Sequence, residues 1–162
     1  MSRTLVVSNR QRARRLNTRF LRSIVWKFLT EELKRDDFEL GISVVNEEAM
    51  TRTNECYLRH QGSTDVITFD YSDAAIDGKL AGEIFVCIDE AMTQAPHFGT
   101  TWQNELVRYI IHGVLHLTGY DDKKSAARKK MKGEEDRLMR KLAAHLKLDQ
   151  ITTARHEKTF AK

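Results

Sequence analysis

Apolar residues recur along this chain with two different spacings, and each spacing predicts one kind of secondary structure. A spacing of three to four residues places an apolar stripe on one side of a helix, whereas alternation or a short apolar run is typical of a strand. In the first long segment Leu16, Phe20, Ile24 and Phe28 recur every four residues. The helices predicted in this way span residues 12–34, 47–59, 90–97, 101–117 and 123–146.

The strands predicted from β-branched, aromatic and alternating segments span residues 4–9, 38–46, 64–71 and 81–89. The last of these is nearly apolar throughout, which predicts a central strand buried on both faces. Four strands and five helices in mixed order indicate a single α+β domain over residues 1–146, with helices packed on a mixed sheet. Residues 147–162 show no clear pattern and are interpreted as a C-terminal tail, with disorder as one interpretation.

Capping residues sharpen some of the predicted helix ends. Asn46 is expected to cap the helix that begins at residue 47, and Asp89 the one that begins at residue 90. Thr101, with Asn104 or Glu105 in its first turn, has the spacing of a capping box.

Composition predicts a soluble globular protein. Of 162 residues, 41% are hydrophobic and 31% are charged. No apolar run approaches the roughly 20 residues that a transmembrane helix needs, so no membrane association is expected. The opening MSRTLVVSNR lacks a signal peptide's apolar core. Cys56 and Cys87 do not make a disulfide framework, and we expect a reduced, cytoplasmic protein.

The positive charge is concentrated in two runs. The net charge is +4 and the pI is about 9.1. Residues 10–22 contain six arginines and no acid, and KKSAARKKMK covers residues 123–132. Solvated helix faces and contacts with nucleic acid both account for such runs, and the sequence leaves the two interpretations open.

The stretch HGVLHLTGYDD, residues 112–122, carries the candidate metal chemistry. His112 and His116 are four residues apart, so on a helix both imidazoles can face one ion. Gly119 tolerates positive φ and permits a sharp turn, which can bring Asp122 back as a third ligand. Histidines on an amphipathic helix without a metal, and aspartates that only cap the following helix, are the alternatives.

Three protein ligands leave a fourth position open, which is typical of a catalytic zinc site. Two imidazoles and a carboxylate suit one Zn²⁺ ion without excluding other transition metals. Glu105, seven residues before His112, is a candidate to orient an imidazole; an exposed acid in the first helical turn is the alternative.

HGVLHLTGYDD resembles the HGxLHLxGYDH signature of the YbeY-type bacterial endoribonucleases, a family of rRNA maturation factors. LRHQGSTDVITF, residues 58–69, is similar to that family's arginine-bearing segment and following strand, and AGEIFVCIDEA, residues 81–91, to its next strand and helix start. MKGEEDRLM, with Met131 and Glu135, fits the final helix. The resemblance covers roughly residues 40–140.

The resemblance implies an α+β fold with a zincin-like metal helix, one zinc ion and cleavage of single-stranded RNA. It further implies roles in 3′-end maturation of small-subunit rRNA and in quality control of ribosomal particles. His112 and His116 take the first two ligand places, and Arg59 falls on the family's functional arginine. Two residues depart from the pattern, because Asp122 replaces the usual histidine ligand and Ser63 a common proline.

Gly113 occupies the position at which an HExxH protease has its catalytic glutamate. Phosphodiester cleavage needs cations near the phosphoryl oxygens, which zinc and Arg59 could provide. A surface ion pair with Glu55 is the alternative for Arg59. A metal-dependent endoribonuclease is therefore the favoured interpretation. A small zinc peptidase and a non-catalytic ribosome-binding factor with structural zinc are the alternatives.

Overall fold

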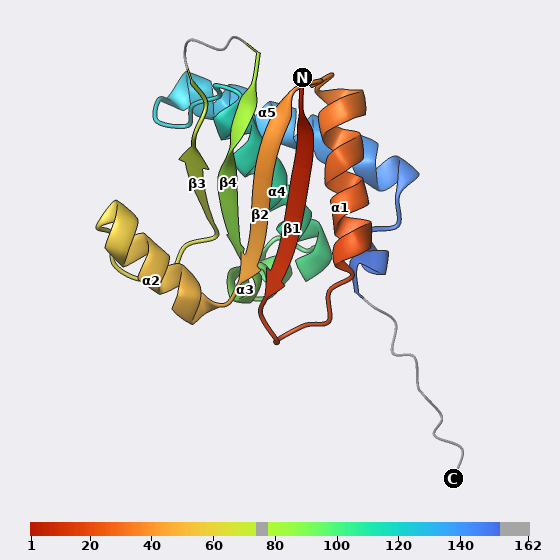
Figure 1. Cartoon of the computed structure of the whole chain (residues 1–162). Coiled ribbons are helices and arrows are strands. Elements are labelled where there is room, and N and C mark those ends of the chain that lie inside the picture. Colours follow the sequence, from red (N-terminus) through yellow and green to blue (C-terminus); the bar gives the residue numbers. More distant parts are fainter. Residues whose placement is uncertain (74–77, 153–162) are drawn as a thin grey trace.

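Four strands form one mixed sheet, as the sequence predicts (Figure 1). The computed structural model describes residues 1–73 and 78–152 of the chain. The strands are β1 Arg3–Arg10, β2 Phe38–Val45, β3 Val66–Asp70 and β4 Leu80–Cys87. They lie in the order β1-β2-β4-β3, with β1, β2 and β4 parallel and β3 antiparallel to β4. Part of the polar turn between β3 and β4, residues 74–77, lies outside the described residues.

Within the described residues, five α-helices and two short helical segments accompany the sheet. The α-helices are α1 Thr18–Lys27, α2 Glu47–Leu58, α3 Ile88–His97, α4 Trp102–Leu117 and α5 Ser125–His145. A π-helical segment, Phe28–Glu32, continues α1, and a 3-10 helix, Leu148–Ile151, follows α5. None of the helices in the described ranges has the length and apolar character that crossing a membrane requires.

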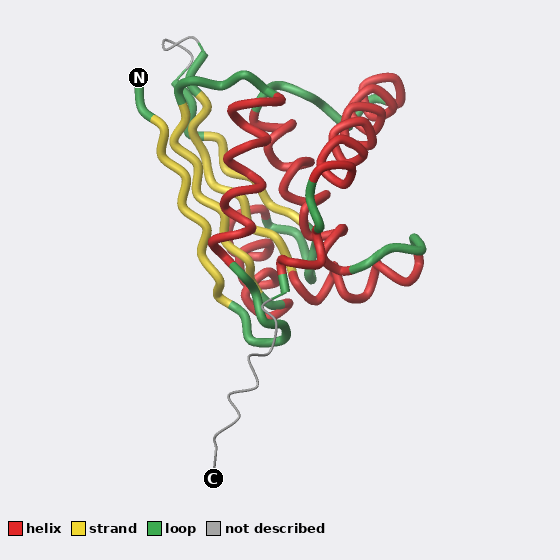
Figure 2. Tube along the Cα trace, turned by 90° about the vertical axis from the view of Figure 1, so that its right-hand side faces the viewer, coloured by secondary structure: helices red, strands yellow, loops and turns green. Residues whose placement is uncertain are grey.

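The two faces of the sheet have different surroundings. Figure 2 shows most of the helices on one side of the sheet, with the other side largely uncovered. Along β4, Leu80, Ile84 and Val86 belong to the main core beneath the helices. Phe85 and Cys87 point the other way and pack with Met50 of α2 in a second, smaller cluster.

β4 is central, as predicted, but it is not buried on both faces along its whole length, because Glu83 is exposed. Only the end of β4 nearest Cys87 is covered by α2, so the alternation of a strand leaves Glu83 in solvent.

The first helix begins later than its apolar stripe predicts. It starts at Thr18, with the side chain of Asn17 accepting a hydrogen bond from the backbone of Phe20. The preceding loop is organised by the buried Gln11, whose side chain donates to the backbone oxygen of Arg14 and accepts from its backbone nitrogen. Arginines at positions 12, 14 and 15 therefore lie in a loop and not on a helix face.

The caps predicted at Asn46 and Thr101 are confirmed. Their side-chain oxygens accept from the backbone nitrogens of Ala49 at 2.9 Å and Asn104 at 3.2 Å. The prediction for Asp89 is wrong, because α3 already begins at Ile88 and Asp89 lies inside it. Its carboxylate instead accepts from the backbone nitrogen of Glu47 at 2.6 Å, so it caps α2 from a distant part of the chain.

The segment after residue 147, interpreted as a tail, starts with ordered structure. Leu148 and Ile151 of the 3-10 helix are buried in the main core, and the Ile151 oxygen accepts from the backbone nitrogen of Asn17. Residues 148–151 are thus packed onto the core, and residues 153–162 lie outside the described residues.

Helix α4 packs very closely against β3 and β4 at Gly113. A Cβ atom at this position would lie 2.9 Å from Cγ2 of Ile84 and 3.1 Å from Cγ2 of Thr68. Such distances leave no space for any larger side chain without movement of the sheet or the helix. Because position 113 has no side chain, α4 can lie directly on the sheet at this point. The neighbouring His112 then lies on the flank of the helix and not on the face that contacts the sheet.

Candidate metal centre

The two histidines of α4 direct the same ring atom toward one point. The Nε2 atoms of His112 and His116 lie 3.1 Å apart, and the ring planes meet at 79°. One helical turn separates the residues, so this convergence follows directly from their spacing. Both side chains keep about a quarter of their surface exposed, which leaves the point between them accessible from solvent.

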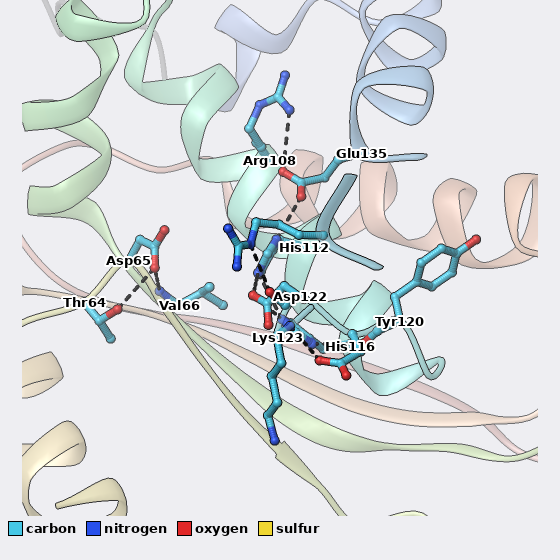
Figure 3. Close-up of polar contacts among 12 residues, drawn as sticks. Thr64, Asp65, Val66, Arg108, His112, His116, Tyr120, Asp122, Lys123 and Glu135 are labelled. Carbon is cyan, nitrogen blue, oxygen red and sulfur yellow. Dashed lines mark hydrogen bonds and ion pairs between the residues drawn. The ribbon is translucent and has the colours of Figure 1, made fainter. Parts of the chain in front are cut away.

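Asp122 completes the group from beyond the end of α4 (Figure 3). The chain turns back at Gly119, which has φ of 105°, and the backbone nitrogen of Tyr120 donates to the Leu115 oxygen. This reversal places Oδ2 of Asp122 3.4 Å from Nε2 of His116 and 3.7 Å from Nε2 of His112. The alternative, a capping role, is not observed for Asp122, whereas Asp121 accepts from the backbone nitrogen of Lys123 in the turn.

The three ligand atoms fit a tetrahedral metal ion. All lie within 4.8 Å of one another. Zinc bonds of about 2.0–2.2 Å in a tetrahedron place the ligand atoms about 3.3–3.6 Å from one another. The three observed separations, 3.1, 3.4 and 3.7 Å, lie in or close to this range. Two imidazole nitrogens and one carboxylate oxygen form a donor set that zinc accepts readily. His112, His116 and Asp122 can therefore hold one metal ion, and three ligands leave it a free position.

Each imidazole is oriented through its other nitrogen. Nδ1 of His112 lies 2.8 Å from Oε2 of Glu135, and Nδ1 of His116 lies 3.2 Å from the backbone oxygen of Tyr120. Both partners accept hydrogen bonds, which favours a proton on Nδ1 and leaves the lone pair of Nε2 for a metal.

Glu135 is itself held by Arg108. The Glu135 carboxylate is buried, and its Oε1 lies 3.5 Å from Nη1 of Arg108, which also contacts Asp136 at 2.7 Å. Burial of the His112 ring lowers its pKa, but the hydrogen bond and charge of Glu135 outweigh burial, so the pKa is raised overall. This carboxylate therefore stabilises positive charge on the imidazole.

Glu105 does not orient a histidine. The Glu135 carboxylate occupies that role for His112. Glu105 is also not an exposed acid, since it is only 4% exposed in the wall beside His112. Burial raises the pKa of Glu105, and the nearby Arg108 partly opposes this effect.

A hollow of about 580 Å³ opens beside the candidate ligands. It extends from the start of β3 to α5, and both His112 and Asp122 line it. Its other charged lining residues are Asp65, Glu90, Glu105, Arg108, Arg128, Lys132 and Glu135. Carboxylates outnumber basic groups in this wall, and a bound cation would offset the excess negative charge.

Comparison with known proteins decides the family. The sequence model of the family described as "Endoribonuclease YbeY" matches residues 6–143 of this chain. The chain belongs to the YbeY endoribonuclease family. It is 34% identical to the Endoribonuclease YbeY of Parabacteroides distasonis over 113 residues, 70% of this chain and 78% of that protein. It is 32% identical to that of Petrotoga mobilis over 119 residues, 74% and 80% of the two chains.

A solved structure supports the same fold. The solution structure of a Thermotoga maritima protein matches with a TM-score of 0.57 and 24% identity. The match covers 86% of this chain and 89% of that one. The α+β fold predicted from the sequence is thus confirmed, including the helix that carries the histidines.

Arg59, which the resemblance in the sequence singles out as a functional arginine, does not line the hollow. It follows α2 with a left-handed backbone, φ 54°, and its side chain is exposed. No ion pair joins it to Glu55, although both residues are described. The loop that Arg59 begins leads directly to Ser63, Thr64 and Asp65, which do line the hollow.

The two basic runs are placed differently. Arg128 and Lys132 of the second run line the hollow, whereas none of the six arginines of residues 10–22 does. Within the first run, Arg22 donates to the Leu5 backbone oxygen and stacks on Trp26 at 5.1 Å. The second run is therefore the one that a ligand of this YbeY family member would meet.

The roles of Glu135 and Arg108 could not be predicted from the sequence. Glu135 is 23 residues beyond His112, on another helix, so only packing of α4 against α5 joins them. Two signals were present in the sequence: Glu135 lies in MKGEEDRLM, which resembles the family's final helix, and it follows Met131 by four residues, on the same side of that helix.

Proposed function

We propose that this YbeY-family protein is a zinc-dependent endoribonuclease that cleaves single-stranded RNA. We further propose that it acts in 3′-end maturation of small-subunit rRNA and in quality control of ribosomal particles. The observation that carries the proposal is the convergence of two Nε2 atoms and one carboxylate oxygen beside an open hollow. Family membership supplies the endoribonuclease class.

Different residues of the chain would hold the metal ion and orient its ligands. His112, His116 and Asp122 would hold the ion, and zinc, when bound, supplies Lewis acidity toward a phosphoryl oxygen and a water. Glu135 and the Tyr120 carbonyl fix the two rings, so that no reorientation is needed when a substrate arrives.

Cationic side chains would receive the substrate's phosphates. Arg128 and Lys132 stand at the wall of the hollow, where phosphates flanking the scissile bond would pass. Arg59 is proposed as the cation that stabilises charge on the scissile phosphate, because a guanidinium can donate two hydrogen bonds to it. Its position at the start of the loop that enters the hollow supports this role.

Gly113 argues against the alternative of a zinc peptidase. A protease glutamate at this position would have to share space with Ile84 and Thr68, since even a Cβ atom would lie within 3.1 Å of both. The position faces the sheet, so a general base cannot be presented from it to a substrate.

The test uses purified full-length protein and a labelled single-stranded RNA, with a duplex RNA and a peptide library alongside. We expect endonucleolytic products from the single strand alone, stoichiometric zinc by elemental analysis, and loss of both activity and zinc in His116→Ala. His145→Ala, an exposed histidine at the end of α5, is the matched control. Cleavage that survives a chelator would contradict the proposal.

A cellular measurement tests the ribosomal role separately. Cells that depend on this protein should accumulate small-subunit rRNA with unprocessed 3′ ends when His116→Ala replaces it. A non-catalytic ribosome-binding factor would instead tolerate Arg59→Ala and show no nuclease activity in vitro.

A further inference from the structure

The hollow beside the candidate metal centre continues into a second one between α4 and α5. The second hollow measures about 420 Å³. Four residues line both hollows, so the two hollows adjoin and are together called the groove: Phe98, Glu105, Arg108 and Lys132. The second part extends to Arg140 and Ala143 on α5 and to Asn104 on α4. A linear ligand at the metal centre therefore has a path leading away along the two helices.

Unpaired positive charge lines this path. Across the part of the chain that the structure describes, no carboxylate lies within 4.0 Å of a charged nitrogen of Lys132 or Arg140. The neighbouring Arg137, which lines neither hollow, is paired with Glu134. Of the two acids in the second hollow, Asp136 is paired with Arg108. Lys132 and Arg140 are thus free to contact an anionic chain.

An exposed aromatic ring stands where the two hollows meet. Phe98 is 70% exposed and follows α3 directly. Its backbone nitrogen donates to the oxygens of Gln94 and Ala95, and the next turn is closed by a bond from Thr100 to Ala95. The backbone that carries the ring is therefore fixed, although the ring itself has no apolar cover. An aromatic face beside free cations is the combination that single-stranded nucleic acid binds through base stacking and phosphate contacts.

We propose that the groove from Phe98 to Arg140 is the binding path for a flanking segment of single-stranded RNA. A base stacks on Phe98, and the phosphates that follow lie beside Lys132 and Arg140. This inference rests on the proposed function, since it names how that substrate continues beyond the metal centre. Any of the four bases can stack, so the path contributes affinity and not sequence specificity.

The test measures binding of fluorescent single-stranded RNAs to the full-length protein by anisotropy. Titrations are run in the cold, and the RNA is checked on a gel afterwards so that only intact strands are scored. We expect Phe98→Ala and Phe98→Leu to raise the Kd about five- to 100-fold, and Phe98→Trp to restore it. The control is Tyr71→Ala, which removes another exposed aromatic residue, 60% exposed against 70% for Phe98, from outside both hollows.

Salt dependence tests the phosphate contacts in the same assay. Lys132→Gln and Arg140→Gln should each reduce the slope of log K against log salt concentration by about 0.7. Arg137→Gln makes the same change of charge on the same helix and should leave the slope unaltered. A lost fold would change Tm as well, so each variant is melted in parallel.

The outcomes separate this inference from the proposed function. The Phe98 and Arg140 variants could bind RNA with the affinity and salt slope of the wild type, while the wild type cleaves RNA. That result would overturn this inference and leave the proposed function standing. Weakened binding in those variants and in neither control supports it, even if no metal-dependent cleavage is found. Equal losses in the variants and their controls would also overturn it, because they indicate a non-specific charge or folding effect.

Discussion

Oε2 of Glu135 lies 2.8 Å from Nδ1 of His112, so a residue of α5 fixes the ring that α4 presents to a metal. Glu135 is buried and is held in turn by Arg108. A buried carboxylate that accepts from a metal-binding imidazole increases the basicity of the ligand and restricts its rotation. The candidate centre is thus a product of two helices and not of the histidine motif alone.

Glu135→Gln should weaken zinc binding about 10-fold, toward the lower end of the range for such outer partners, because the amide keeps the shape but not the charge. Zinc affinity is measured by competition with a chromophoric chelator. Glu134→Gln is the matched control, since Glu134 pairs with Arg137 and makes no contact with His112. Equal zinc affinities in the two variants would show that Glu135 does not support the ion.

Gly113→Ala should destabilise the protein by about 1–3 kcal/mol, because the new methyl group would be forced against Ile84 and Thr68. The free energy of unfolding is obtained from urea titrations. Gly133→Ala, in the open on α5, should instead stabilise by up to about 1 kcal/mol through helix propensity. Stabilisation by both substitutions would disprove the close packing of α4 on the sheet.

Removal of the metal should abolish RNA cleavage while the protein stays folded. The core extends from the sheet to the helices through about thirty buried apolar residues, none of which needs the ion for its packing. Circular dichroism with EDTA should retain the helical signal, with a lowered Tm because a ligand of the folded state is lost. Unfolding on chelation would instead favour a purely structural role for zinc.

Arg59→Ala should lower kcat/KM for RNA at least about 10-fold without loss of stability, if the guanidinium stabilises charge on the phosphate. Arg59→Gly should lose activity to the same extent. Its free energy of unfolding should rise by about 1 kcal/mol, because the left-handed backbone suits glycine better. Arg59→Lys, which keeps the charge but not the two-pronged geometry, should be intermediate. Full activity in all three variants would remove Arg59 from the site.

Glu105→Gln should raise Tm near neutral pH and have no effect in acid. Burial raises the pKa of Glu105 in the folded protein, so its ionisation disfavours folding. Below the ordinary carboxyl pKa both states carry a neutral group and the difference vanishes. It grows as pH rises from the unfolded-state pKa to the raised folded-state pKa, and it is constant above that. Melting curves of metal-free protein across this window provide the check, and a pH-independent difference would contradict it.

Most elements of the fold could be predicted from local pattern. The caps at Asn46 and Thr101 and the spacing of His112 and His116 involve contacts within one turn, which the sequence displays directly. The start of α1 cannot be predicted from the apolar stripe, which begins at Leu16. The side-chain hydrogen bonds of Gln11 that organise the preceding loop have no simple sequence signature. The capping role of Asp89 cannot be predicted locally, because its partner, Glu47, belongs to another element.

The sequence by itself determined the sheet, the helices and the three residues that can share a metal ion, because periodicity and short-range spacing fix them. Only the tertiary structure decided which residues support that ion and where a substrate strand could run. Glu135, Arg108 and Phe98 come together by the packing of α3, α4 and α5. The physical reason is that a contact between residues far apart in the chain depends on how whole elements pack, which no local pattern records.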